Sequence, residues 1–211
     1  MIALIDYRAG NLRSVRIGLE RAGAQVTEAK TASDLQGCSG VVLPGVGAFG
    51  QGMDNLRRQG LVGPLQEWAG SGKPLLGICL GLQLLFDESD ELGRHEGLGI
   101  LPGRVERLPE GKGLKIPQIG WNSVERTLHA ARSPYSAALP EGAYFYFNNS
   151  YVVKPADAET SLATTDYGEP FCSVAGRGGV FAAQFHPEKS AEAGLRILER
   201  FVELAAAASP Q

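Results

Sequence analysis

Short apolar runs alternate with helical patterns through the first half of the chain. Each run is four residues or fewer and ends at a glycine, a proline or a polar residue, which is typical of short buried strands. The stretches between the runs carry apolar residues at helical spacing, as Leu12, Val15 and Leu19 do. The expected strands are 2–5, 25–27, 40–43 and 75–78, and the expected helices are 12–22, 53–58 and 61–69. This alternation predicts an α/β fold with a mostly parallel central sheet and helices on both faces.

The pattern changes from about Leu98 onward. Glycines break the sequence into short apolar pieces that predict antiparallel strands at 144–147, 151–153, 171–174 and 180–183. Gly178-Gly179 predicts a tight turn between the last two. A final helix is expected to bury Ala193, Ile197, Phe201 and Leu204 on one face. We therefore expect one domain over residues 1–211, an α/β unit with an antiparallel β extension.

Composition and charge narrow the class of protein. With 44% hydrophobic and 20% charged residues, the chain has the composition of a soluble globular protein. A net charge of −3 without a block of Lys and Arg argues against nucleic acid as a partner. No apolar run approaches the ~20 residues of a membrane span, and no signal peptide pattern precedes the first strand. Three scattered cysteines favour free thiols in a reducing cytoplasm.

The strongest candidate for chemistry is Cys79, which lies where a predicted strand meets a predicted helix. Gly77 precedes it by two residues and Gly81 follows it by two. This is the spacing of a nucleophile elbow, a strand-to-helix turn so tight that only glycines fit beside it. Such a turn presents a thiol at the edge of the sheet. The alternative is an inert cysteine packed in the core.

A second candidate is the pair His186 and Glu188. His186 follows a predicted strand and precedes the last helix, so it too falls at the carboxyl end of a strand. The two-residue spacing allows the Glu188 carboxylate to fold back onto the imidazole, and Pro187 restricts the turn between them. With Cys79 these residues supply the nucleophile, base and orienting group of thiol acyl transfer. The alternative is a surface His–Glu pair without a task.

A third candidate is the glycine loop at residues 44–50, Pro-Gly-Val-Gly-Ala-Phe-Gly. It matches the G-x-G-x-x-G dinucleotide pattern formally. However, it does not follow the first strand, and no strand with a terminal acid follows at about 20 residues. A glycine loop after a strand can instead present backbone N–H groups to a developing oxyanion. The alternative is a simple tight turn.

Together the motifs Gly77-Ile78-Cys79-Leu80-Gly81 and His186-Pro187-Glu188 resemble those of the class I, or triad, glutamine amidotransferases, and the similarity extends over essentially the whole chain. Further stretches resemble a narrower group in that family, whose members supply ammonia to a separate cyclase. These stretches are Asp6-Tyr7, Gly10-Asn11, 44–49, 115–117, 120–122, 149–151 and Lys189-Ser190. The Pro-Gly-Val-Gly loop separates this group from the glutaminases of pyridoxal phosphate and anthranilate synthases, which usually have two adjacent glycines after the proline.

The resemblance implies hydrolysis of L-glutamine to glutamate and ammonia through a cysteinyl thioester, without a metal or cofactor. The implied catalytic residues are Cys79, His186 and Glu188. The implied oxyanion hole comprises backbone N–H groups of Leu80 and of the Val46–Gly47 peptide. The implied glutamine-binding residues are Gln83, Glu91, Ser150 and Tyr151. Without the family, Gln83 would be read as an ordinary helix residue and Glu91 as part of a solvated acidic run.

The resemblance also implies a partner, a (β/α)8-barrel cyclase subunit that forms a heterodimer with this chain. Residues expected near the partner are Gln118, Trp121, Asn122, Tyr146, Asn149 and Lys189. The family often has histidine at the positions of Gln118 and Asn149, so we hypothesise that a polar contact is kept there without pH sensitivity. The chain carries no Walker-type phosphate loop, which agrees with binding of the phosphorylated substrate by the cyclase.

Three other functions remain as alternatives. The chain could serve a different synthase, such as the pyridoxal phosphate or anthranilate synthase. It could be a scaffold that keeps the fold without turnover, or a stand-alone cysteine hydrolase that acts on another acyl substrate. Ammonia release from glutamine separates the last two from a glutaminase, and the identity of the partner separates the first.

Overall fold

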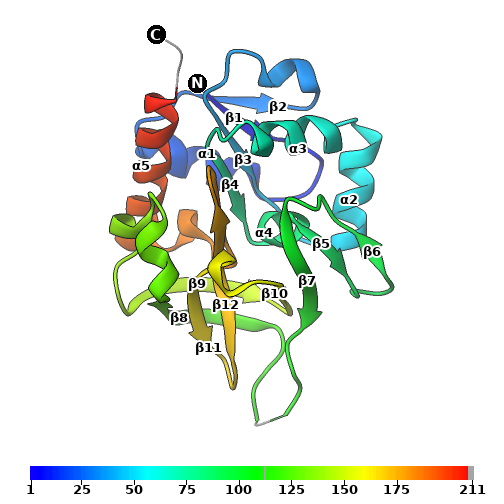
Figure 1. Cartoon of the computed structure of the whole chain (residues 1–211), viewed down its shortest axis with the longest axis vertical. Coiled ribbons are helices and arrows are strands. Elements are labelled where there is room, and N and C mark those ends of the chain that lie inside the picture. The colour runs from blue at the N-terminus through cyan, green and yellow to red at the C-terminus, as the bar shows by residue number, and fades with distance from the viewer. Residues whose placement is uncertain (112, 209–211) are drawn as a thin grey trace.

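The parallel half of the sheet holds the strands on which the candidate residues lie. The computed structural model describes residues 1–111 and 113–208. Parallel strands are hydrogen-bonded in the order β2-β1-β3-β4-β13 (Figure 1). Their bounds are β1 Ile2–Ile5, β2 Val26–Ala29, β3 Gly40–Leu43, β4 Leu75–Ile78 and β13 Val180–Ala183. The pairing of β4 with β13 brings together segments about a hundred residues apart in the chain.

Helices cover both faces of these strands, because successive strand residues point to opposite sides. Ile2 and Leu4 pack with α1 and α5, whereas Ala3 and Ile5 pack with α2, α3 and α4. Figure 1 shows α1 and α5 together on one side of the parallel strands. The helices are α1 Leu12–Arg21, α2 Phe49–Arg58, α3 Val62–Gly70, α4 Leu80–Leu84 and α5 Ala191–Ala207.

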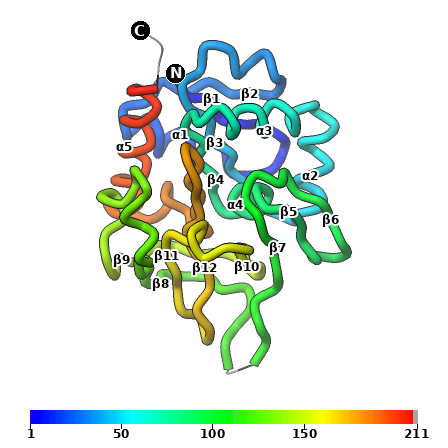
Figure 2. Tube along the Cα trace, viewed as in Figure 1, coloured from blue at the N-terminus to red at the C-terminus, as the bar shows by residue number. Residues whose placement is uncertain are grey.

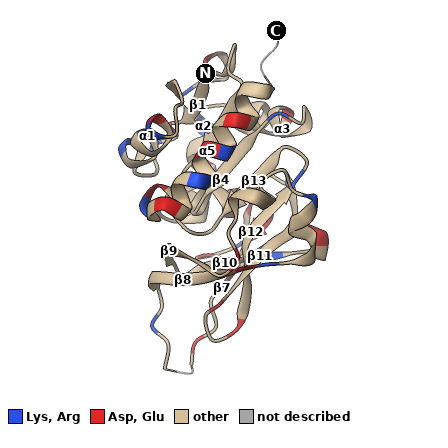
Figure 3. Ribbon diagram, turned by 90° about the vertical axis from the view of Figure 1, so that its left-hand side faces the viewer, with Lys and Arg blue, Asp and Glu red and all other residues tan. Residues whose placement is uncertain are grey.

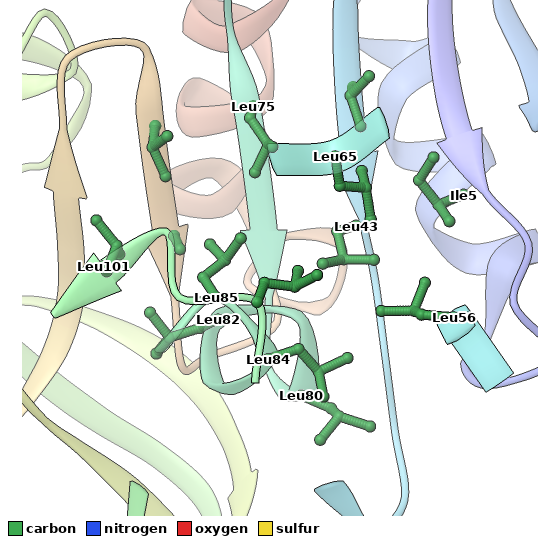
Figure 4. Close-up of a cluster of buried hydrophobic side chains, with 14 of the residues drawn as sticks. Ile5, Leu43, Leu56, Leu65, Leu75, Leu80, Leu82, Leu84, Leu85 and Leu101 are labelled. Atoms are coloured by element: carbon green, nitrogen blue, oxygen red, sulfur yellow. The ribbon is translucent and has the colours of Figure 1, made fainter. Parts of the chain in front are cut away.

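The short helix α4 is anchored by its own leucines. In Figure 4 the side chains of Leu80 and Leu84 point into the core near Leu43 of β3 and Leu56 of α2. All four are at most 2% exposed. Burying such a side chain contributes roughly 1.5–3 kcal/mol, so packing rather than length stabilises this single turn of helix.

The antiparallel half extends from β13 through β12, β10 and β7 (Figure 2). Its longer strands are β7 Leu101–Arg107, β8 Gln118–Arg126, β9 Ala143–Asn149, β10 Tyr151–Pro155, β11 Ser161–Asp166 and β12 Pro170–Arg177. Two short strands complete its edge, β5 Phe86–Ser89, which pairs with β7 in parallel, and β6 His95–Glu96, which pairs with β5 in antiparallel fashion. The chain then returns through β13 to α5, which lies against α1.

Charged residues of both signs are interspersed on the ribbon, as Figure 3 shows along α5. On that helix Arg196 pairs with Glu192 at 2.6 Å and Arg200 with Glu203 at 2.9 Å. Of the helices in the described part of the chain, none has the length and apolar character needed to cross a bilayer.

Each predicted strand and helix is present and in the predicted order, with differences at the boundaries, but strands β5, β6, β7, β8 and β11 were not predicted. In α5 the fully buried residues are Gly194, Ile197, Leu198, Phe201 and Ala205. The predicted Ala193 and Leu204 are only half-buried, because the stripe is centred one position to the side. Helix α2 begins at Phe49, earlier than predicted, and the predicted domain ends at residue 211, outside the described residues.

Candidate active site

Three loops meet at the carboxyl edge of the parallel strands. They follow β3, β4 and β13, which are neighbours in the sheet. A pocket opens beside them, and nine of its eleven lining residues are predicted site or partner residues, the other two being Pro117 and Asn148. The lining residues are Val46, Gly47, Cys79, Leu80, Gln83, Glu91, Pro117, Asn148, Asn149, Ser150 and Tyr151. A ligand site at this edge is what a parallel α/β sheet favours.

Cys79 has the backbone conformation of a nucleophile elbow. Its φ is 55° and its ψ is −109°, a region that residues other than glycine rarely occupy. Its N–H donates to the Ala183 carbonyl at 2.8 Å, which continues the β4–β13 pairing into the turn. A side chain at Gly81 would collide with the Leu43 carbonyl on β3, so glycine is required there. The predicted elbow is thus present.

His186 and Glu188 form a buried pair at the end of β13. Imidazole Nδ1 lies 2.8 Å from the Glu188 Oε1 atom, and the two side chains are 4% and 2% exposed. An ionised carboxylate only accepts, so Nδ1 carries the proton and Nε2 is the nitrogen left for other chemistry. The Ser190 hydroxyl donates to the His186 carbonyl at 2.6 Å and so fixes the backbone of the turn.

The electrostatic surroundings favour a charged imidazole. Burial alone would lower the pKa of His186, but the neighbouring Cys79 sulfur and the Glu188 carboxylate together raise this pKa above its ordinary value. Nε2 makes no hydrogen bond of ordinary length within the described residues. Catalytic hydrogen bonds are often long before substrate binds. The arrangement suits a thiolate–imidazolium pair at Cys79 and His186.

The predicted oxyanion donors are close to the thiol but are not all available. The Leu80 N–H donates to the Gly45 carbonyl at 3.3 Å, so this donor already has a partner. The loop beyond Gly45 depends on Gly47, whose φ of +111° suits glycine alone. Its start is fixed by the buried Tyr7, whose hydroxyl donates to the Pro44 carbonyl at 2.7 Å.

The predicted glutamine-binding residues line the same pocket. Gln83 is buried and donates from Nε2 to the Tyr151 carbonyl at 3.1 Å. The Glu91 carboxylate accepts the Phe49 N–H at 2.6 Å. That bond caps α2, whose Ncap residue Ala48 has no capping side chain, and it explains why α2 starts at Phe49. Glu91 therefore lines the pocket and contacts α2 rather than lying on a solvated acidic face, and its role in binding glutamine stays a prediction.

The residues expected near a partner divide into two groups. The first group lies on the outer face of the β8–β9 hairpin, where Trp121 and Tyr146 are opposite each other. Lys189, in the turn after β13, lies beside Tyr146. The rings of Trp121 and Tyr146 meet edge to face at 6.3 Å, and the Lys189 ammonium lies 5.8 Å from the Tyr146 ring. Asn122 is half-buried and donates to the Asp166 carbonyl at 2.8 Å.

Gln118 and Asn149 do not share that face. They pair across β8 and β9, are 2% and 5% exposed, and point to the inner side of the hairpin. Their side chains are therefore not exposed on the outer face, and their expected proximity to a partner stays a prediction. Asn149 instead belongs to the pocket and donates to the Tyr151 carbonyl at 3.2 Å.

One residue of the site carried no predicted role. Gln184 is fully buried one position beyond β13, and its Nε2 lies 3.7 Å from the Cys79 Sγ atom. The only signal in the sequence is an amide between the apolar strand 180–183 and Phe185, where an apolar residue would be expected. No group of three or more His, Cys, Asp or Glu side chains in residues 1–111 and 113–208 is arranged to hold a metal ion.

Comparison with known proteins decides the family. The family model described as "Glutamine amidotransferase class-I" matches residues 3–204. The imidazole glycerol phosphate synthase subunit HisH of Symbiobacterium thermophilum is 49% identical over 197 residues, 93% of this chain and 91% of that protein. The HisH subunit of Syntrophotalea carbinolica is 47% identical over 209 residues, 97% of this chain and 100% of that protein. This chain belongs to the class I glutamine amidotransferases, in the HisH family.

A solved structure agrees with the fold of the amidotransferase. A crystal structure of a glutamine amidotransferase matches with a TM-score of 0.75 at 22% identity, covering 98% of this chain and 100% of that chain. This match confirms the predicted fold class, and the family model and the HisH relatives confirm the predicted family and enzyme class. The roles of individual residues stay predictions that rest on the geometry above.

The contact between Glu188 and His186 leads to a prediction about how the activity of the amidotransferase depends on pH. The carboxylate favours the imidazolium, so Glu188→Gln lowers the pKa of His186. Loss of the proton that the leaving ammonia needs then occurs at lower pH. We expect the alkaline limb of the kcat/KM profile for ammonia release from glutamine to move down by about one pH unit.

The matched control for this experiment is Glu192→Gln on α5. Glu192 is an exposed carboxylate paired with Arg196, away from the imidazole. Its replacement should leave the profile unchanged. An alkaline limb that stays in place in Glu188→Gln would contradict the assigned role of the carboxylate.

Proposed function

We propose that this chain is the glutaminase subunit of imidazole glycerol phosphate synthase, in histidine biosynthesis. It hydrolyses L-glutamine and delivers the ammonia to a cyclase subunit that makes imidazole glycerol phosphate and AICAR. The observation that carries the proposal is the meeting of Cys79, His186 and Glu188 beside one pocket. The 47–49% identity to HisH subunits supports it and favours this synthase over the pyridoxal phosphate and anthranilate synthases.

In the first half of the reaction, the Cys79 sulfur attacks the side-chain amide carbon of glutamine. Negative charge develops on the amide oxygen, where N–H groups of Leu80 and Gly47 are the proposed donors. The C–N bond then breaks, and the His186 imidazolium gives its proton to the departing ammonia. Glu188 keeps the imidazole in the orientation and tautomer that this transfer needs.

In the second half, water attacks the glutamyl thioester. His186, now neutral, accepts a proton from the water, and the C–S bond breaks to release glutamate and restore the thiolate. Each step uses side-chain or backbone groups of this chain, so the proposal includes no metal or cofactor. Free Cys38, Cys79 and Cys172 suit a reducing compartment, and we place the enzyme in the cytoplasm.

The pocket offers complementary groups to both ends of the amino acid. Glu91 is suited to the α-ammonium of glutamine, while backbone groups of Ser150 and Tyr151 are suited to its α-carboxylate. Gln83 lies between these residues and the elbow, one turn of helix beyond Cys79. In this proposal the side-chain amide of a bound glutamine faces the thiol.

The outer face of the β8–β9 hairpin is the proposed docking surface for the cyclase. Ile119, Trp121 and Tyr144 are 62%, 53% and 60% exposed, and they alternate with inward residues so that they share one face. Exposed aromatic residues in one patch are typical of protein interfaces. Tyr146 lies opposite Trp121 on the neighbouring strand, and its backbone carbonyl accepts the His186 N–H at 2.9 Å. This surface therefore adjoins the turn that carries His186. We propose a heterodimer.

The proposal is tested by ammonia release from glutamine with and without the cyclase and its nucleotide ligand. Cys79→Ala should abolish release, whereas Cys38→Ala should retain it, since Cys38 lies at the opposite end of β3. Release that survives in Cys79→Ala would rule out the assigned nucleophile. Recovery of a different synthase in a pull-down, with no stimulation by the cyclase, would assign the chain to another client.

The docking surface makes a separate prediction. Trp121→Ala should raise the Kd for the cyclase at least ~10-fold, because large aromatic residues carry much of the binding energy of an interface. Leu128→Ala is the control, since Leu128 is 80% exposed but lies outside the hairpin. Isothermal titration of each variant with the cyclase measures the effect. Equal affinities for both variants would place the interface elsewhere.

The conformation of the glycine loop leads to a prediction about how the cyclase stimulates glutamine hydrolysis. A side chain at Gly47 would meet open space, so Gly47→Val acts through its +111° φ rather than through a clash. We expect cyclase-stimulated kcat to fall at least ~10-fold while KM for glutamine changes less than ~3-fold. Gly63→Ala on α3, where φ is ordinary and space is open, is the control. Equal losses in both parameters would indicate a collapsed pocket instead.

A further inference from the structure

Gln184 contacts the nucleophile and a residue of the glutamine pocket at once. It is 0% exposed, and its backbone N–H donates to the Ser173 carbonyl at 2.9 Å. On one side its Nε2 lies 3.7 Å from the Cys79 Sγ atom. On the other its Oε1 accepts from Gln83 Nε2 at 3.1 Å. Neither contact has a part in the mechanism described above.

The hydrogen-bond network fixes which end of the Gln184 amide faces the sulfur. The Tyr151 carbonyl can only accept, and it takes hydrogens from Gln83 Nε2 at 3.1 Å and from Asn149 Nδ2 at 3.2 Å. The nitrogen of Gln83 therefore faces Tyr151, and its second hydrogen is directed to the oxygen of Gln184. The nitrogen of Gln184 is left for Cys79, since a reversed amide would set two donors against each other.

We propose that Gln184 is a positioning residue that donates an N–H to the Cys79 thiolate and links its reactivity to Gln83. The proposal rests on the proposed function of Cys79 as the nucleophile. Tyr151, Gln83, Gln184 and Cys79 then form one chain of hydrogen bonds from the pocket wall to the reacting atom. A change at Gln83 reaches the sulfur even when no glutamine is bound.

The second polar neighbour of the sulfur shows why such a donor is needed. Cys79 Sγ lies 3.8 Å from the Asn148 carbonyl oxygen. A thiol can donate weakly to that oxygen, whereas a thiolate is repelled by it. The Gln184 N–H acts in the opposite sense, because a donor favours the charged sulfur. The amide does so without a charge of its own and without titrating.

Titratable groups also surround the sulfur. His186 approaches it from the turn after β13, with Glu188 behind the imidazole. Tyr7 lies two residues beyond the end of β1. Burial and the charge of Cys79 raise the pKa of Tyr7, so its hydroxyl stays neutral. Replacing Gln184 alters none of these groups directly, and its effect on the thiol is separable from theirs.

The test is the pH dependence of Cys79 alkylation by iodoacetamide in the full chain, without glutamine, followed by mass spectrometry of the Cys79 peptide. Gln184→Met keeps the volume and removes the donor. We expect its alkylation midpoint to rise by about one pH unit, which is about a 10-fold slower reaction at a fixed pH below the midpoint. Ser173→Ala is the matched control. Its buried hydroxyl has no hydrogen-bond partner among the described residues, so the midpoint should not move.

A second variant tests the link without touching Gln184. Gln83→Leu releases the Gln184 amide from its fixed orientation, and the midpoint should rise in the same direction by a smaller amount. With the cyclase present, Gln184→Met should lower kcat about 10-fold and change KM less than about 2-fold. Gln83→Leu should raise KM as well, because Gln83 lines the pocket.

Each outcome bears on the proposal. An unmoved midpoint in folded Gln184→Met, judged by near-ultraviolet circular dichroism, would overturn it. If that variant does not fold, Gln83→Leu decides, and an unmoved midpoint there would also overturn it. A shift in Gln184→Met alone would disprove the link to Gln83. Failure of the wild-type chain to release ammonia would instead count against the proposed function, because alkylation does not depend on glutamine.

Discussion

The positive φ of Cys79 is the constraint on which the rest of the site depends. A non-glycine residue in such a conformation costs of order 1–3 kcal/mol and persists only where the surroundings hold it. The hydrogen bond to Ala183 fixes one side of the turn, and the leucines of α4 hold the other side in the core. Gly81 lets α4 approach the Leu43 carbonyl. The sulfur is thereby set between the loops after β3 and β13.

The groups on the two sides of that sulfur differ in whether they are already positioned for the reaction. Toward β13, His186 is already bonded to Glu188, and the Gln184 amide already faces the thiol. Toward β3, the Leu80 N–H is engaged by the Gly45 carbonyl. The nucleophile and its base are thus in place in the isolated chain, whereas the donors for an oxyanion are not fully exposed.

The sequence predicts best what is local. Glycines two residues either side of Cys79, and a carboxylate two residues after His186, define turns that need no distant contact. The existence of an antiparallel extension follows from the same short patterns, whereas the order of the strands in the sheet is set by distant pairings such as that of β4 with β13. The contact of Glu91 with Phe49 spans 42 residues, and that of Gln184 with Cys79 spans 105. Neither leaves a periodic signal, which is why the start of α2 and the role of Gln184 could not be predicted.

Local sequence patterns also do not reveal which face of the β8–β9 hairpin is buried, and that face decides which residues a partner can contact. Period-two alternation sends Trp121 and Tyr146 outward and Gln118 and Asn149 inward, but only the register of β8 and β9 reveals which set is which. A partner on the outer face meets a His186–Glu188 pair whose hydrogen bond is already made. Val46, which is 43% exposed and lines the pocket, belongs instead to the loop after β3. Under the proposed function, a docked cyclase therefore has most to change at the loop after β3, where freeing the Leu80 N–H from the Gly45 carbonyl would complete the proposed oxyanion site.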